Sequence, residues 1–316
     1  MGRKLISIVV PCYNEEETLH ILYKELNRIA TEMSDYKFEY VFVNDGSKDK
    51  TLSVLKELAE GDDKVKYVSF SRNFGKEAGL LAGLRHAKGD IVATMDADMQ
   101  DPPTLLPELV GYVESGEYDN AATRRVSRKG EPVIRSFFAR SFYKMMRHMT
   151  DINIVDGARD YRVMSRAMVD AILSMPEYNR FSKGIFAWVG FETKWVEFEN
   201  VERSAGETKW SFWKLFRYSV EGIVSFSNTP IHMASYLGMG LTVVSLLAFL
   251  FVFIRALIVG DPVAGWPSLV CIITFLGGVQ LFVMGVMGQY IAKTYMEVKK
   301  RPHYIVKDTN TWEKED

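Results

Sequence analysis

The first third of the chain alternates between two hydrophobic periodicities. Continuous apolar runs, typical of buried strands, are separated by segments with the apolar spacing of one helix face. The runs read LISIVV, FEYVFVN, VKYVSF and DIVATMD. The helical patterns extend from Glu15 to about Met33, from Thr51 to Ala59 and from Gly75 to Ala87. Repeated strand and helix units of this size predict an α/β domain in which helices cover a mostly parallel sheet.

A different pattern fills the C-terminal part of the chain, where two long stretches carry no charge. No Asp, Glu, Lys or Arg occurs from Gly222 to Ile254 or from Pro262 to Ala292. A helix needs about 20 apolar residues to cross the hydrocarbon core of a membrane. We therefore predict spans over about Tyr236 to Val259 and about Ser268 to Ile291. The alternative is a pair of helices buried in a soluble domain, but such helices rarely run so long without a charged face.

Basic residues flank both predicted spans on the same side of the membrane. They are Lys209, Lys214 and Arg217 before the first span, and Lys293, Lys299, Lys300 and Arg301 after the second. The connecting segment, GDPVAGWP, has no Lys or Arg unless Arg255 extends into it. The positive-inside tendency predicts a membrane hairpin with both termini in the cytoplasm.

Composition adds limits to this picture. The 316 residues carry a formal net charge of -1, which argues against a protein that binds nucleic acid through its overall charge. Cys12 and Cys271 lie in regions of different character and give no disulfide framework, as expected in a reducing compartment. The N-terminal apolar run ends at Pro11 and three glutamates, which is too short for a secretory signal.

Polar clusters follow three of the predicted strands. The first strand ends in PCYNEE, the second in NDGS and the fourth in DADMQD. Each cluster alone could be an ordinary turn. In parallel sheets, however, ligands bind at the carboxyl ends of the strands. Three such clusters at one edge therefore predict a crevice with acidic walls.

The motifs, taken in order, resemble those of a known family. They read VVPCYNEEE, VNDGSKDKT, SRNFGKEAGL, GDIVATMDADMQDPP, DYRVMSR and AGETKWS, followed by the two uncharged stretches. This set resembles the inverting family 2 glycosyltransferases with a GT-A fold, most closely the polyprenyl-phosphate glycosyltransferases of the bactoprenol glucosyltransferase and dolichyl-phosphate mannose synthase type. The resemblance runs from about Ile6 to Tyr304, whereas a lone D-x-D triplet would be weak support.

The resemblance implies an organisation for the whole chain. It implies a cytosolic GT-A domain over residues 1–206, interfacial amphipathic helices over 207–232, two transmembrane helices over 233–292 and a cytosolic tail over 293–316. The aromatic and basic mix around Trp210, Phe212, Trp213 and Phe216 suits a helix that lies on the bilayer, although a core-packing helix is the alternative. Related enzymes also make a homotetramer an expectation.

The reaction implied is transfer of one sugar from a UDP-sugar to a polyprenyl phosphate such as undecaprenyl phosphate, with inversion. Glucose is the expected sugar, on family frequency alone. Departure of the nucleoside diphosphate builds negative charge, which Mg²⁺ or Mn²⁺ bound by oxygen ligands can neutralise. The family's metal segment corresponds to Asp96, Asp98 and Gln100, with Asp98 favoured as a direct ligand and Asp96 as a ligand of the ribose or of a metal-bound water. The alternative is a solvated acidic turn capped by Pro102 and Pro103.

Residues at the other strand ends are expected to bind the nucleotide-sugar. Asp45 can accept a hydrogen bond from the imide N–H of uracil. Arg72 or Lys76 could contact the diphosphate, although either could equally be a solvated charge at a helix end. The predicted set is Pro11, Tyr13, Asn14, Glu15, Asp45, Arg72, Lys76 and Asp96.

Two carboxylates are candidates for the catalytic base or charge-positioning group. Asp156 is the first choice and Asp160 the second. The family's usual Gly-Asp-Phe-Arg is replaced here by Arg159-Asp160-Tyr161-Arg162. The register between the two aspartates therefore stays open. A phosphate monoester acceptor is already anionic near neutral pH, so it needs less deprotonation than a hydroxyl.

An anionic lipid head needs cations near the membrane. Arg can bind phosphate oxygens in pairs, whereas Lys acts as a point charge. The predicted acceptor-phosphate residues are Arg124, Arg128, Arg135, Arg140, Arg162, Arg203 and Lys209.

Two other classes of protein remain as alternatives. A processive polysaccharide synthase normally carries more spans and a Q-x-x-R-W type motif, which this chain lacks. A non-catalytic membrane scaffold with a GT-A-like domain would not need the intact acidic set, and release of UDP would distinguish the two cases.

Overall fold

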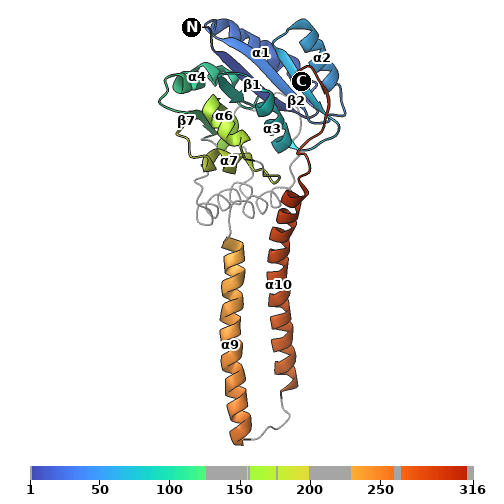
Figure 1. The fold of residues 1–316 in the computed structure, drawn as a ribbon, viewed down its shortest axis with the longest axis vertical. Helices are drawn as coiled ribbons and strands as arrows, with labels where there is room; N and C mark the ends of the chain where they lie inside the picture. Colours follow the sequence, from blue (N-terminus) through green and yellow to red (C-terminus); the bar gives the residue numbers. More distant parts are fainter. Residues whose placement is uncertain are drawn as a thin grey trace.

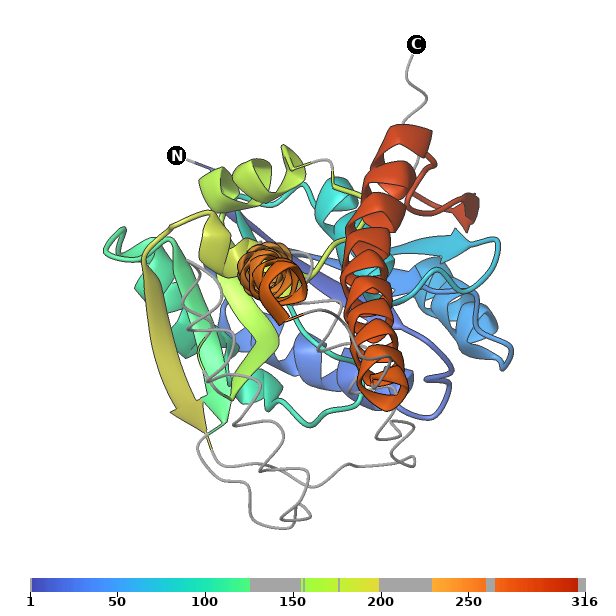
Figure 2. The ribbon, with the colours of Figure 1, turned by 90° about the horizontal axis from the view of Figure 1, so that it is seen from below.

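A computed structural model describes residues 2–125, 155, 157–175, 177–198, 229–259 and 265–311. They form an α/β domain from which two long helices project side by side, α9 (Thr229–Val259) and α10 (Trp266–Lys299) (Figure 1). Seen along these helices, both leave the same side of the domain (Figure 2).

The first half of the domain is the predicted parallel sheet. Its strands are β1 (Leu5–Cys12), β2 (Lys37–Asn44), β3 (Val65–Phe70) and β4 (Ile91–Thr94), and its helices are α1 (Leu19–Glu32), α2 (Thr51–Gly61) and α3 (Lys76–His86). β1 pairs in parallel with β2 and with β4, and β2 pairs in parallel with β3. Alternate residues of β1 enter different cores: Ile8 packs with residues of α1 and of a later helix, α4 (Leu106–Glu114), and Val9 packs with residues of α3 and of the later helices α6 (Arg166–Leu173) and α7 (Ser182–Trp188). The strands are mostly apolar because helices cover both faces.

The helix boundaries differ from the predicted ones mainly at α1. The pattern predicted a start at Glu15, whereas the helix begins at Leu19. The backbone N–H of Glu15 donates to Thr51 Oγ1 at 2.9 Å, and that of Glu16 donates to Asp49 Oδ2 at 3.3 Å. These side chains hold the first acidic residues in a loop, so the helix forms only after them. α2 ends two residues later than the predicted Ala59, and α3 agrees with its predicted range within one residue at each end.

The second half of the domain adds antiparallel pairing. It contains η1 (Pro103–Leu105), α4 (Leu106–Glu114), β5 (Asn120–Arg125), β6 (Ala158–Ser165), α6 (Arg166–Leu173), α7 (Ser182–Trp188) and β7 (Thr193–Phe198). β6 runs antiparallel to both β4 and β5, and β5 is parallel to β7. Because β6 is antiparallel to β4, its N-terminal end lies at the carboxyl end of β4. The Thr94 hydroxyl donates to the Asp160 carbonyl at 2.6 Å and marks this meeting point.

After α10 the chain returns to the domain and adds an edge strand, β8 (Val306–Thr309), antiparallel to β3. The sheet order is β7-β5-β6-β4-β1-β2-β3-β8. Asn310 follows β8, and its side-chain oxygen accepts from the Tyr67 N–H at 2.7 Å. The Tyr304 ring stacks on Phe70 with centroids 4.8 Å apart. The sequence did not predict this strand.

The two long helices contact each other and extend beyond the predicted spans at both ends, except that α9 ends at the predicted Val259. Many of their described apolar side chains are exposed, among them Leu247, Phe251, Ile272, Phe282 and Met284. Among the described residues, Phe275–Lys299 is the one segment that length and composition qualify for a membrane span, with a mean hydropathy of 1.4. The C-terminal part of α10 is joined to the α/β domain by a hydrogen bond: the Glu297 carboxylate accepts from the Tyr178 N–H at 2.9 Å.

Candidate functional site

The loops that follow β1 and β2 are joined by side-chain hydrogen bonds. The backbone N–H of Asn14 donates to Ser47 Oγ at 3.0 Å, and the Lys48 N–H donates to Asn14 Oδ1 at 2.9 Å. Asn14 has a φ of 55°, a conformation that Asn tolerates better than most residues. The neighbouring Tyr13 ring is 36% exposed at this edge. The pair therefore places an accessible aromatic ring on a fixed loop.

Two other residues of the predicted nucleotide set have structural contacts. A Cβ added at Gly79 in α3 would lie 3.2 Å from the Pro11 side chain, so this helix packs tightly on the end of β1. The backbone of Glu15 is held by Thr51, as described above. The first contact fixes α3 against the end of β1, and the second fixes the loop after β1 against the start of α2.

Asp45 holds the loop that follows β3. Its carboxylate accepts the backbone N–H of Phe74 at 2.6 Å and of Gly75 at 2.9 Å. Burial raises the pKa of Asp45, while these two N–H donors lower it in part. Each carboxylate oxygen has a further lone pair, so Asp45 can hold the loop and still accept a hydrogen bond from a nucleotide base.

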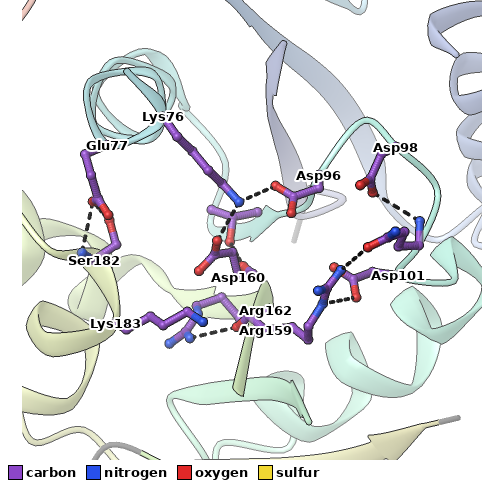
Figure 3. A network of polar contacts seen from close by, with 12 residues as sticks. Lys76, Glu77, Asp96, Asp98, Asp101, Arg159, Asp160, Arg162, Ser182 and Lys183 are labelled. Carbon is purple, nitrogen blue, oxygen red and sulfur yellow. Dashed lines mark hydrogen bonds and ion pairs between the residues drawn. The ribbon is translucent and has the colours of Figure 1, made fainter. Parts of the chain in front are cut away.

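The two predicted diphosphate cations lie differently. The Arg72 guanidinium lies 4.1 Å from the centre of the Phe74 ring and donates to the Asn73 carbonyl at 3.0 Å. Lys76 reaches into the crevice, where its Nζ lies 2.6 Å from Asp96 Oδ1 and 2.5 Å from Asp160 Oδ2 (Figure 3). Lys76 thus joins two predicted site carboxylates that come from different strands.

The charges of this group stabilise one another. Burial alone would raise the pKa of Asp160, but the cations of Lys76, Lys183 and Arg162 lower it below its usual range. Burial would likewise lower the pKa of Lys76, but Asp160 and Asp96 raise it above its usual value. Asp160 and Lys76 are therefore both charged at neutral pH.

A second group of contacts surrounds the loop after β4. Asp98 Oδ1 accepts the Gln100 N–H at 3.2 Å, and the Gln100 side-chain oxygen accepts from Arg159 at 3.4 Å. Asp101 Oδ1 accepts from Arg159 Nε at 2.7 Å. Its other oxygen is buried and has no hydrogen-bond partner within the described residues. Burial raises the pKa of Asp101 to about 6; Arg159 opposes this, and Asp96 and Asp98 add to it.

This acidic group fits a divalent cation held in part by substrate. Burial is the main cause of the raised pKa of Asp101, the charges of Asp96 and Asp98 add to it, and a cation would relieve their repulsion. Among the residues that the structure describes, no three His, Cys, Asp or Glu side chains are arranged to hold a metal. Mg²⁺ often needs only one or two carboxylates together with substrate phosphates. Asp98 stays the predicted direct ligand; Asp96 is paired with Lys76, and the Gln100 side-chain oxygen accepts from Arg159.

The predicted acceptor cations are only partly described. Arg124 pairs with Glu197 at 3.2 Å across β5 and β7. Arg162 is buried, with its guanidinium 3.7 Å from the centre of the Phe186 ring. The remaining candidates lie outside the described residues: Asp156 among the carboxylates, and Arg128, Arg135, Arg140, Arg203 and Lys209 among the cations.

The structure adds side chains that the sequence analysis did not assign to the site. Lys183 and Ser182 come from α7, Glu77 follows Lys76 in α3, and Arg159 and Asp101 form an ion pair. Only the last pair had a local signal, since Asp101 is the third carboxylate of its cluster and Arg159 precedes Asp160. The α7 residues lie in a short amphipathic segment that carries no motif.

Comparisons with known proteins agree with this geometry. The family model described as "Glycosyl transferase family 2" matches residues 7–173. The Bacillus subtilis (strain 168) protein named "Putative glycosyltransferase CsbB" is 43% identical over 310 residues, covering 98% of this chain and 93% of that protein. The "Prophage bactoprenol glucosyl transferase homolog" of Escherichia coli (strain K12) is 43% identical over 302 residues. The "Bactoprenol glucosyl transferase" of Shigella phage SfII is 43% identical over 305 residues. Both alignments cover 96% of this chain and 98% of the relative.

The likeness extends over nearly the full length of each relative, and the family model covers the loops that follow β1, β2, β3 and β4. A mostly parallel sheet with an acidic loop after β4 is the architecture that the sequence resemblance implied. The chain belongs to glycosyl transferase family 2.

Proposed function

We propose that this protein transfers a single sugar, glucose, from a UDP-sugar to a polyprenyl phosphate such as undecaprenyl phosphate, with inversion at the anomeric carbon. Relatives named as bactoprenol glucosyl transferases, 43% identical over almost the whole chain, support the acceptor and the sugar. The exposed apolar surfaces of α9 and α10 support a lipid-bound acceptor, because such surfaces mark membrane or protein contact.

The observation that carries the proposal is the bridge made by Lys76. Its ammonium touches Asp96, at the end where the donor diphosphate would bind, and Asp160, where the acceptor would attack. An in-line displacement needs donor and acceptor groups at one place with fixed orientation. Lys76 couples the two sides of the crevice within one set of contacts.

Protein residues have defined tasks in this reaction. The loops of Tyr13, Asn14 and Asp45 would hold the uracil and ribose, and Lys76 would turn from Asp96 toward the arriving diphosphate. A phosphate oxygen of the acceptor then forms a bond to C1 of the sugar while the bond from C1 to the UDP oxygen breaks. The electron pair of that bond leaves with UDP. Asp160, which stays ionised at neutral pH, would orient the attack; Asp156, the first choice from the sequence, lies outside the described residues and stays the other candidate for this role.

Mg²⁺ or Mn²⁺, when bound, would supply positive charge for the departing diphosphate. Asp98 is the proposed direct ligand, and Asp96 the proposed second contact through the ribose or a water molecule. Both carboxylates follow β4 directly, so the short loop fixes their distance from the crevice floor.

The membrane arrangement is part of the same proposal. Residues 1–206 form most of the catalytic domain, 207–232 an interfacial segment, 233–292 two transmembrane helices and 293–316 a cytosolic tail that supplies β8 to the sheet of the domain, with catalytic domain and both termini at the cytoplasmic face. α9 includes the last four residues of the interfacial range. A homotetramer would place several such hairpins together in the inner membrane.

The decisive experiment is a screen of UDP-sugars against undecaprenyl phosphate with the purified full-length protein in detergent. Mass detection of the lipid product identifies the sugar, and the anomeric configuration of the product reports inversion. We expect UDP-glucose to give glucosyl-phosphoryl-undecaprenol. Release of UDP without a lipid product for every donor would contradict the proposal.

A further inference from the structure

A carboxylate in α3 holds the start of α7. Glu77 Oε2 accepts the Ser182 N–H at 2.9 Å and also the Ser182 hydroxyl (Figure 3). Glu77 follows Lys76, so neighbouring residues of one helix turn bind the crevice carboxylates and α7. Burial raises the pKa of Glu77, and the donors of Ser182 counteract this by favouring its charged form. The Glu77–Ser182 contact therefore fixes where α7 begins relative to the crevice.

The residue that this contact positions is Lys183. Its Nζ donates to the Ala158 carbonyl at 3.0 Å, and its charge helps to lower the pKa of Asp160. Lys76 and Lys183 approach Asp160 from opposite sides (Figure 3). An ammonium group has three donors. Within the described residues, the Ala158 carbonyl takes the single hydrogen bond found for Lys183, which leaves donors for a ligand.

Arg162 is less suited to meet an incoming phosphate, although it lies close by. It is 2% exposed, its guanidinium packs on Phe186 of α7, and one terminal nitrogen donates to the Arg159 carbonyl at 3.2 Å. Lys183 is only half-buried. Of these two cations, Lys183 can reach an anion without rearranging the core.

Electrostatic repulsion between the acceptor phosphate and Asp160 explains why a cation is needed at the position of Lys183. An acceptor phosphate carries about -1.5 to -2 charges near neutral pH, and it must approach an ionised Asp160. That approach is repulsive unless a cation stands on the same side. Lys76 already pairs with Asp96 and Asp160. Lys183 is the described cation on the other side of Asp160, and α7 lies on the side of the domain from which α9 and α10 project (Figure 1).

We propose that Lys183 binds the phosphate of the lipid acceptor, and that Glu77 is the positioning residue that sets Lys183 through Ser182. This inference rests on the proposed function for the identity of the acceptor. It goes further by assigning the acceptor-phosphate contact to α7 rather than to the arginines.

The first measurement is direct binding, which does not depend on turnover. The purified full-length protein is titrated with farnesyl phosphate, with farnesol and with UDP. We expect the wild type to bind farnesyl phosphate at least about tenfold more tightly than farnesol, and Lys183→Met to lose most of that difference while keeping its UDP affinity. Lys183→Arg should restore the preference for farnesyl phosphate over farnesol. Lys194→Met removes a lysine that lies over Tyr112 in the same domain and should behave as wild type.

The second measurement separates positioning from folding. Glu77→Ala should raise the KM for undecaprenyl phosphate several-fold with the KM for UDP-glucose unchanged, and Glu77→Gln, which can still accept from Ser182, should lie between it and the wild type. An equal rise of the KM for undecaprenyl phosphate and of the KM for UDP-glucose would mean a general structural role for Glu77 and would overturn the positioning claim.

Other outcomes decide the remaining cases. Loss of UDP affinity in Lys183→Met, with farnesyl phosphate unaffected, would assign Lys183 to the donor and overturn the proposal. Unchanged preference for farnesyl phosphate over farnesol would overturn it as well. If the wild type formed no lipid product with any donor, the proposed function would fail, while the binding comparison would still test Lys183.

Discussion

At the scale of single residues, Lys76 is the cation whose removal has the most specific consequence. Without the Lys76 charge, the negative charges of Asp96 and Asp160 are less neutralised, and the effect of burial then raises the pKa of Asp160. A raised pKa means that Asp160 becomes protonated at a higher pH. For Lys76→Gln we therefore expect the acidic limb of the kcat/KM profile to move to higher pH, in addition to a lower maximum. Lys48→Gln, a change at an exposed lysine, is the control, and an acidic limb that did not move would contradict the assigned coupling.

A second prediction at this scale concerns the metal. Asp98→Asn keeps the size of the side chain but removes the charge that a divalent cation requires. We expect transfer to fall by more than the roughly 10- to 100-fold typical of outer-sphere partners, with thermal unfolding unchanged. Asp63→Asn, at an exposed position, should remain active. Full activity of the wild type in EDTA would rule out the metal role of Asp98.

At the scale of elements, the contact between the β2 and β3 loops gives a matched pair of glycine variants. Gly46 has a φ of 61°, and an added Cβ would lie 2.3 Å from the Arg72 carbonyl carbon. Gly116 has a φ of 73° with open space around it. Both alanine variants bear the left-handed backbone cost of about 1–2 kcal/mol, but Gly46→Ala also forces the loops apart.

We expect Gly46→Ala to lower the melting temperature more than Gly116→Ala and to weaken UDP binding, because Asp45 and the loop it holds move with residue 46. Thermal unfolding and UDP titration measure the two effects. Equal melting temperatures and equal UDP affinities for the two variants would show that the loop contact is unimportant.

The same elements show what the sequence could and could not predict. The parallel strands, their helices and the carboxylates after β4 followed from local patterns, because a buried strand and its terminal loop are contiguous in the chain. The contact of Glu77 with Ser182 joins positions 105 residues apart, and Lys76 reaches Asp160 across 84 residues. Such pairs depend on tertiary packing, which local periodicity does not encode. β8 was missed for a related reason: VKDT is four residues long, with two charges, and gains strand structure from its partner β3.

At the scale of the whole molecule, the direction of the two helices relative to the membrane can be tested. In the sequence, basic residues precede α9 and occur at the C-terminal end of α10, and none occurs from Gly260 to Gly265. We expect a reporter fused after Asp316 to read cytoplasmic and one inserted at Ala264 to read external. A cytoplasmic signal at Ala264 would mean that the helices do not form the hairpin.

The return of the chain to form β8 has a consequence for biosynthesis. The ribosome completes β3 early, but its partner strand β8 emerges only after α9 and α10 have been made. Until then β3 is an open sheet edge with unpaired backbone groups, which is a template for pairing with other chains. A nascent chain that stalls before β8 is made therefore retains an unpaired edge, and a shortened protein that ends before residue 306 carries it permanently. Synthesis of the two long helices and closure of the sheet are thus sequential events in the maturation of one molecule.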